Sequence, residues 1–234
     1  MIQDIPLFIK NLEKSIQSMP QNIQETTETA KKVVIETTEK VVPEPVKNMV
    51  IETSDKIQEK SSEMLKKLEE DQIQRDKEQK IVDEKYLQDI ALQIHELINE
   101  ERTKNDLTSL YWNPTLSDIA KKHSEDMATR VYFEHESPEG KTFSDRYDEG
   151  NFNCEIITSV TETGNGIATK YAMGGENINY LEGYSGVDNI STTAVKGWMN
   201  SPGHKENILT KYWKSEGIGV AESGDKIYVT QDFC

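Results

Sequence analysis

The sequence contains few cysteines. Only Cys154 and Cys234 occur among its 234 residues, and they are too few and too widely spaced for a zinc ribbon. Two interpretations stay open: two buried or free thiols, or one disulfide that ties the last residue to its domain. We favour the disulfide, because closing so long a loop would stabilise the folded chain. A disulfide predicts an extracellular or cell-surface location, where conditions are oxidising.

Long apolar runs are also missing. No stretch of about 20 apolar residues occurs, so we predict no transmembrane segment. The start, MIQDIPLFIKNLEKS, lacks the basic end, long apolar stretch and small-residue cleavage site of a signal peptide. No signal peptide is therefore visible, which argues against secretion of the sequence as written and conflicts with the disulfide prediction. A truncated or misassigned start would reconcile the two.

Aromatic residues are nearly absent from the first third. Phe8 is the only one in 1–85, whereas Trp112, Trp198 and Trp213 all lie later. A chain that gathers its large apolar groups in one region has one compact core and one extended arm. We therefore predict a helical or low-complexity arm at 1–85 and a globular domain at 86–234.

Basic residues are outnumbered by acidic ones both in the arm and in the domain. The arm carries 18 acidic and 14 basic residues, the remainder carries 24 and 13, and the formal net charge is −15. An acidic domain repels phosphate backbones, so we exclude nucleic acid as a partner.

The arm has a helical pattern with little apolar content. A stripe with steps of four and three residues runs along 23–41, Pro43 and Pro45 interrupt it, and the segment 34–40 is repeated at 50–56. Because Thr and Ala in the stripe bury little area, any self-association would be weak. The arm is therefore a coiled-coil spacer, a weak membrane-surface helix, or a marginal or partly disordered tether.

The domain combines early helices with late strands. Apolar spacing predicts one helix from Tyr86 to about Asn105 and another from about 114 to 127. We expect residues 150–175 to be loop, with or without short strands, and we expect short helices at 194–199 and 205–211. Alternating residues around 218–220 and 227–229 predict a β-hairpin. The fold class is α+β, as a helix–sheet–helix sandwich.

Three polar residues on loops are candidates for chemistry. His135 lies in a turn-rich segment, Glu176 follows Gly174-Gly175, and His204 follows a helix break. Two imidazoles and a carboxylate can hold a divalent cation such as zinc and leave positions open for water. By contrast, His95 on the first predicted helix is most simply a surface or rim residue, and His123 is most simply packed at the edge of a cleft.

A series of motifs gives these residues a context. In order along the chain they are Asn99-Glu-Glu-Arg102, Leu110-Tyr-Trp112, His123-Ser-Glu-Asp-Met127, Phe133-Glu-His-Glu-Ser-Pro-Glu-Gly140, Asp145-Arg146, Gly175-Glu-Asn-Ile178, Trp198-Met-Asn-Ser-Pro-Gly-His204, Asn207-Ile-Leu209, Gly217-Ile-Gly-Val220 and Thr230-Gln-Asp-Phe233. This order resembles the microbial branch of the CAP superfamily of cysteine-rich secretory, antigen 5 and pathogenesis-related 1 proteins. The resemblance covers about residues 87–233 and implies a three-layer α-β-α sandwich with a cleft.

The resemblance also implies a cleft tetrad of two His and two Glu. His135, Glu176 and His204 match three of its members, and Ser201 stands where the second Glu is usual. Because Ser carries no charge, we expect a divalent metal such as zinc to bind weakly, through His135 and His204.

Two functions compete for this cleft. The first is a binding module for a lipid, peptide or glycan, which we favour. The second is a metal-dependent hydrolase in which Glu176 acts as general base.

Overall fold

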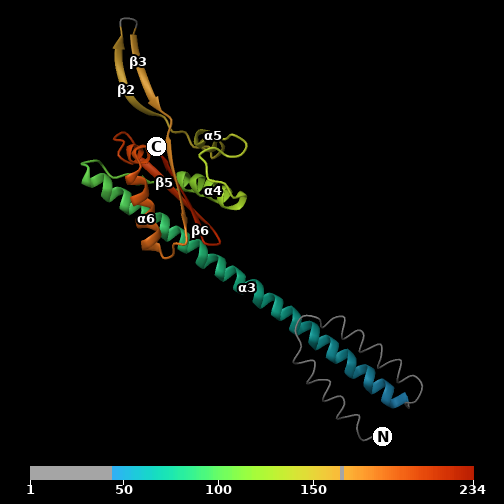
Figure 1. Cartoon of the computed structure of the whole chain (residues 1–234). Helices are drawn as coiled ribbons and strands as arrows, with labels where there is room; N and C mark the ends of the chain where they lie inside the picture. The colour runs from blue at the N-terminus through green and yellow to red at the C-terminus, as the bar shows by residue number, and fades with distance from the viewer. Residues whose placement is uncertain (1–43, 164–165) are drawn as a thin grey trace. The chain divides into compact units, whose positions relative to one another are not determined.

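The structure is a computed structural model that describes residues 44–163 and 166–234. The stripe predicted over 23–41 and the first copy of the repeat lie outside these residues. Contacts divide the chain into two units, Met1–Glu78 and Gln79–Cys234, and the second begins slightly before the predicted boundary at residue 86. The elements are α3 (Glu44–Lys104), β1 (Tyr111–Trp112), α4 (Pro114–Arg130), α5 (Phe143–Glu149), β2 (Ile156–Thr163), β3 (Gly166–Ala172), β4 (Gly175–Glu182), α6 (Val187–Asn200), α7 (Pro202–Ile208), β5 (Ser215–Ser223) and β6 (Lys226–Phe233) (Figure 1).

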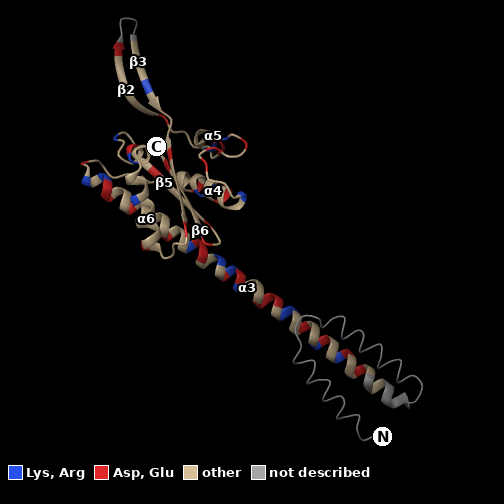
Figure 2. Cartoon of the chain, viewed as in Figure 1, with Lys and Arg blue, Asp and Glu red and all other residues tan. Residues whose placement is uncertain are grey.

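In the first unit, the described residues form the N-terminal part of α3. Pro45 lies in the first turn, where its missing N–H costs no hydrogen bond. Acidic and basic side chains are interspersed along this part of the helix (Figure 2), and Lys66 and Glu70 form one of its i,i+4 pairs. Apolar side chains such as Met64 and Leu68 are more than half exposed. The coiled coil and the self-association of the arm stay predictions.

The second unit is built on a four-stranded sheet with the order β1-β5-β6-β4. Strands β5, β6 and β4 are antiparallel neighbours, and the short β1 runs parallel to β5. The β5–β6 hairpin predicted from alternation is confirmed, with Val220 opposite Val229. Since β4 is an edge strand, its start is accessible to side chains from the surrounding loops.

One face of the sheet carries the main core. Ile218, Val220, Ile227 and Val229 pack in one cluster with Ile90, Ile94 and Ile98 of α3 and with Trp198 of α6. The Trp198 indole N–H donates to the Ile178 carbonyl at 2.8 Å, which attaches α6 to β4. The spacing of the three Ile residues explains this layer, because positions four apart lie on one side of a helix.

Helix α4 covers the opposite face at very short range. A Cβ on Gly217 would lie 2.1 Å from the Ser117 backbone N, and one on Gly219 would lie 1.9 Å from the Lys121 backbone N. Only glycine permits this approach. The Ser124 hydroxyl then donates to the Gly219 carbonyl at 3.0 Å. Together with α5, this layer completes the predicted three-layer α-β-α sandwich.

Local elements differ from the sequence prediction at several places; α6, for example, begins at Val187 and not at the predicted 194. The segment 150–175, predicted as mostly loop, contains the two-stranded β2–β3 sheet, because its Ile, Val and Thr residues favour strands. Helix α5 was not predicted, although Thr142 and Asp145 form a capping box at its start. Helix α7 begins at Pro202, earlier than the predicted 205, because proline suits the first helical turn.

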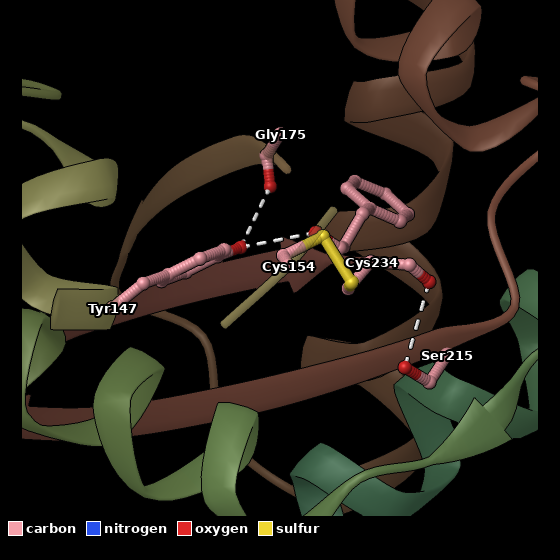
Figure 3. Close-up of a disulfide and its surroundings, with 6 residues drawn as sticks. Tyr147, Cys154, Gly175, Ser215 and Cys234 are labelled. Carbon is pink, nitrogen blue, oxygen red and sulfur yellow. Dashed lines mark hydrogen bonds between the residues drawn. A yellow bond between two sulfur atoms is a disulfide. The ribbon is translucent and has the colours of Figure 1, made fainter. Parts of the chain in front are cut away.

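The predicted disulfide is confirmed. Cys154 and Cys234 are bonded, with Cα atoms 5.6 Å apart, and join the segment before β2 to the end of β6 (Figure 3). Beside the bond, the Tyr147 hydroxyl lies 3.1 Å from the Phe233 carbonyl and 3.3 Å from the Gly175 carbonyl. The bond and these contacts fix the starts of β2 and β4 against the end of β6. Within the described residues, no helix is long and apolar enough to cross a membrane.

Candidate functional site

The site is centred on Glu176, near the start of edge strand β4. Its side chain is only 1% exposed, so its negative charge needs partners within the protein. The side chain faces the α4 side of the sheet, where it lies opposite Asp232 of β6 in the strand register.

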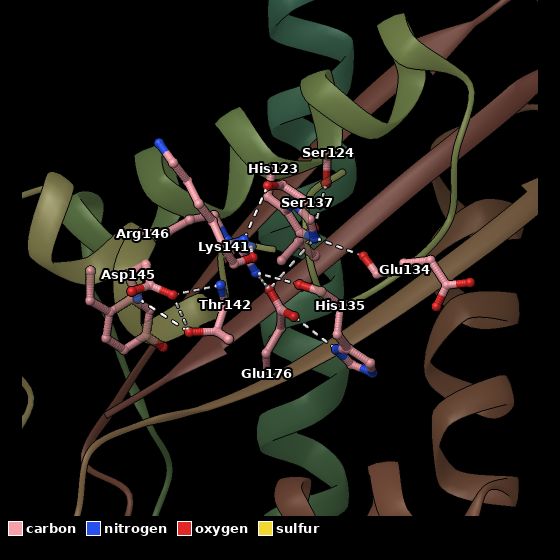
Figure 4. Close-up of polar contacts among 12 residues, drawn as sticks. His123, Ser124, Glu134, His135, Ser137, Lys141, Thr142, Asp145, Arg146 and Glu176 are labelled. Atoms are coloured by element: carbon pink, nitrogen blue, oxygen red, sulfur yellow. Dashed lines mark hydrogen bonds and ion pairs between the residues drawn. The ribbon is translucent and has the colours of Figure 1, made fainter. Parts of the chain in front are cut away.

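Three cationic or titratable side chains surround the Glu176 carboxylate (Figure 4). His135 Nδ1 lies 2.8 Å from Oε1, the Arg146 guanidinium of α5 donates to Oε2, and His123 Nε2 of α4 lies 3.9 Å from Oε2. Both carboxylate oxygens are therefore engaged. The Arg146 side chain is 10% exposed, so this charge-assisted pair is largely screened from water.

Three histidines lie near the site, and their pKa values shift in different directions. The hydrogen bond to Glu176 raises the pKa of His135, against the opposing effect of burial. Burial lowers the pKa of His123, and the charge of Glu176 only partly offsets it. Burial and the positive charge of His135 lower the pKa of His204. Of the three, His135 is thus the imidazole most inclined to carry a proton.

Asp232 is a second carboxyl beside Glu176. It is fully buried, and within the described part of the chain neither of its oxygens has a hydrogen-bond partner. Burial and the neighbouring Glu176 charge raise the pKa of Asp232 well above its ordinary value. The rise has a plain cause, because two ionised carboxylates would repel each other in this buried place.

The predicted tetrad is only partly assembled. The structure brings His135 and Glu176 into direct contact, and His204 lies close enough for the charge of His135 to affect it. The His204 carbonyl accepts a hydrogen bond of 3.2 Å from Asn177 Nδ2. Ser201 links α6 to α7, and its side chain makes no capping hydrogen bond. Among the described residues, no hydrogen bond joins its side chain to His135 or Glu176.

A tightly bound divalent metal does not fit this arrangement. The described residues contain no group of three or more His, Cys, Asp or Glu side chains arranged to hold a metal ion. Glu176 gives both oxygens to His135 and Arg146, so a metal would have to displace a guanidinium. Of the ligands predicted from the sequence, the imidazoles of His135 and His204 would then remain.

A cavity of about 400 Å³ opens beside the pair of His135 and Glu176. Its lining comprises His135, Glu136, Thr142, Phe143, Gly174, Gly175, Glu176 and Asn207. A second cavity, of about 420 Å³, is lined by His123 and Arg146 among others. Other charged side chains around that cavity are paired, as Arg130 is with Glu139 at 2.6 Å. We call the first cavity the cleft.

Sequence reasoning gave no role to several residues of this site. Arg146, Asp232 and Asn207 stood within recognised motifs, but nothing in the sequence placed them beside Glu176. His95 was predicted to be a surface or rim residue, yet its side chain is 16% exposed and contacts the buried Glu216. A useful signal was present in Glu216 and Asp232, since charged residues in otherwise apolar strands need buried partners.

Comparisons with known proteins place this geometry in a family. The family model described as "CAP: Cysteine-rich secretory protein family" matches residues 95–233. The chain is 33% identical over 143 residues to "Uncharacterized membrane protein YlbC" and 37% identical over 129 residues to "Uncharacterized protein YkwD", both of Bacillus subtilis. These matches cover 60% and 55% of this chain, but only 33% and 41% of the two relatives.

Solved structures include similar chains. An extracellular protein of Bacillus anthracis that contains an SCP domain is 29% identical, with a TM-score of 0.47; the alignment covers 62% of this chain and 39% of that one. A cysteine-rich secretory protein of Staphylococcus aureus is 19% identical, with a TM-score of 0.42 and coverages of 62% and 38%. Since the family model covers more than half of its residues, the chain belongs to the CAP, or cysteine-rich secretory protein, family.

Proposed function

We propose that this domain is a binding module whose cleft takes a polar ligand, a peptide or a glycan, in preference to a lipid. The observation that carries the proposal is the pair of His135 and Glu176. The buried carboxylate fixes one ring nitrogen of His135, while 53% of that side chain stays exposed. A ring fixed in this way offers its other nitrogen to a ligand with little further loss of entropy. Five of the eight lining residues carry polar side chains, which suit the hydrogen-bonding groups of a peptide or a glycan.

The alternative of a metal-dependent hydrolase has less support. A general base must come within about 2.6–3.2 Å of the proton that it removes. Glu176 is 1% exposed and already accepts hydrogen bonds from His135 and Arg146. Both of its oxygens are thus already occupied by protein groups, as expected for a residue that orients His135.

Metal binding in this proposal is weak and secondary. Two neutral imidazoles, those of His135 and His204, would hold a cation such as zinc, and the Lewis acidity of zinc is what it would supply there. Imidazole coordinates only when deprotonated, so the raised pKa of His135 further weakens binding at neutral pH and below.

An extracellular or cell-surface location is part of the same proposal. The disulfide supports it, because such bonds persist in oxidising compartments. Mass spectrometry of the alkylated, non-reduced protein from its native source tests this point. Two alkylated thiols would contradict it.

Nuclear magnetic resonance (NMR) titration of the His135 ring tests the binding function. Three probes separate the ligand classes: tetra-alanine, chitotetraose, and a short-chain phosphatidylcholine below its micelle concentration. We expect the peptide or the glycan to shift the His135 signals, and His135→Ala to weaken binding at least tenfold. Tyr111→Ala, at a position 76% exposed and outside the cleft lining, is the matched control. A response to the lipid alone, or none in any arm, would overturn the proposal.

A further inference from the structure

The two-stranded ribbon of β2 and β3 carries an uncovered apolar face. Figure 1 shows the ribbon extending beyond the four-stranded sheet. The register places Tyr171 opposite Ile157 and Thr169 opposite Val160, and residues that stand opposite each other share a face. Ile167 lies two positions from Thr169 in β3, so it is on that face too. Its four large apolar side chains are each more than half exposed: Ile157, Val160, Ile167 and Tyr171. We call this surface the ribbon face.

The opposite face of the ribbon is the one that meets the domain. Ile156, at the base of β2, is half-buried and packs against both the main core and the cluster around Cys154. Farther along the same face stand polar residues, with Ser159 opposite Lys170. The larger apolar side chains are thus on the side that the domain does not cover. Because a two-stranded ribbon is marginally stable by itself, covering the ribbon face would stabilise it.

Charge favours a second copy of this chain as the cover. Residues 86–234 carry 24 acidic and 13 basic residues, so two domains repel each other over most of their surface. The ribbon is an exception, because Glu162 and Lys170 are its only charged residues and they cancel. Lys170 lies on the opposite face, and Glu162 lies near the tip. The ribbon face is therefore a place where two acidic copies can approach with little repulsion.

The ribbon face is complementary to itself when two copies stack in opposite directions. A two-fold axis across the ribbon at Val160 lays β2 over β2 and β3 over β3, so Val160 meets Val160 of the second copy. Tyr171 then faces Ile167 of the second copy, because both lie two positions from Thr169, which is opposite Val160. Stacking in the same direction would instead bring the two acidic domains together at the bases of the ribbons.

Glu162 is the one charged group on the ribbon face. In the opposed arrangement it lies beside the pair of Ile157 and Tyr171 of the second copy. The phenol O–H of that Tyr171 is a donor for a carboxylate. The charge therefore stays at the rim of the contact, with a partner.

The area of the ribbon face sets the strength of the contact. Half the surface of a large side chain is about 100 Å², so four such side chains on each copy would bury about 800 Å² in total. Interfaces below about 1,200 Å² belong to weak and transient complexes. The contact is thus reversible and depends on concentration.

We propose that the ribbon face is a self-association surface, on which a second copy of this chain docks in the opposite direction through Val160, Ile167 and Tyr171. The contact leaves the cleft free, because the cleft lining lies within residues 135–143, 174–176 and 207, outside both strands. It is also separate from any association of the arm, which would use the N-terminal part of α3.

Sedimentation velocity of the full chain tests the surface, over about 10 μM to about 1 mM, the range in which weak complexes form. Val160→Lys/Ile167→Lys places two charges on the ribbon face, and we expect it to weaken association at least tenfold. Ser159→Lys/Thr161→Lys is the matched control, because it adds the same charge to the opposite face of the same ribbon. We expect the control to associate like the wild type.

Three results would overturn the proposal. The first is a sedimentation coefficient that does not rise with concentration. The second is an equal effect of the two variants, which would assign the change to net charge or the association to the arm. The third is binding of the monomeric wild type to phosphatidylcholine vesicles that Val160→Lys/Ile167→Lys abolishes and the control retains, which would make a lipid surface the occupant.

Photochemical cross-linking tests the arrangement in a chain whose other residues are unchanged. Tyr171→p-benzoylphenylalanine keeps an aromatic ring at this exposed position, and mixing isotopically labelled with unlabelled chains identifies links between copies. We expect links to the segment of β3 that contains Ile167. Links to Ile157 of β2 would indicate stacking in the same direction, and an absence of links between copies would refute the contact even if the lysine variants fail to fold.

Discussion

Removing the disulfide should lower stability mainly through the unfolded state. The bond closes a loop with a sequence separation of 80 residues, which corresponds to about 4.5 kcal/mol when loop entropy alone is counted. The native end of β6 has other attachments, since the Cys234 N–H donates to the Ser215 carbonyl at 2.9 Å and the Cys234 carbonyl accepts from Lys214 N at 2.7 Å. We therefore expect Cys154→Ala/Cys234→Ala to keep the native fold but to melt about 9–18 °C lower.

Urea unfolding followed by tryptophan fluorescence measures this loss. The wild type with reduced thiols is the matched control, because it lacks the bond but keeps both sulfur atoms in the apolar cluster around Cys154. Both samples should lose most of the 4.5 kcal/mol with little change in the denaturant slope. A loss below about 1 kcal/mol in the reduced wild type would refute the reasoning, because the unfolded chain would then gain little freedom without the bond.

Three further predictions concern packing, protonation and metal binding. Gly219→Ala should destabilise the domain by at least about 3 kcal/mol, because its Cβ would meet the α4 backbone; Gly203→Ala, in an open helical position, should be neutral or stabilising by thermal melting. Glu176→Gln should lower the pKa of His135 in an NMR titration, since the raised pKa comes first from that carboxylate. In the wild type, the stabilisation from the pair of His135 and Glu176 is therefore fully present below the unfolded pKa of about 6.5. It is lost as pH rises through the higher pKa that His135 has in the folded protein. An unchanged His135 pKa in the variant would contradict the pairing. Calorimetry at neutral pH should show weak zinc binding that tightens in Ser201→Glu if the new carboxylate reaches the imidazoles, and unchanged affinity would place Ser201 outside any metal site.

Much of the fold could be predicted because its signals are local. The period of the Ile residues in α3, the alternation of β5 and β6, and the proline after α6 each depend on neighbours within a few residues. The β2–β3 hairpin was largely missed because its Gly and Asn content resembled a loop. Its strands follow instead from β-branched residues, whose preference depends more strongly on context.

The sequence by itself determined the layered fold and pointed to His135, Glu176 and His204 as candidate cleft residues. Periodicity and the order of motifs depend only on positions along the chain. Only the tertiary structure decided what those residues contact. The contacts of Glu176 with Arg146 and Asp232, and of His95 with Glu216, join residues as many as 121 positions apart. The physical reason is that most buried polar groups need a partner within the protein. Sheet register and helix packing, which operate across the whole domain, decide which partner is within reach.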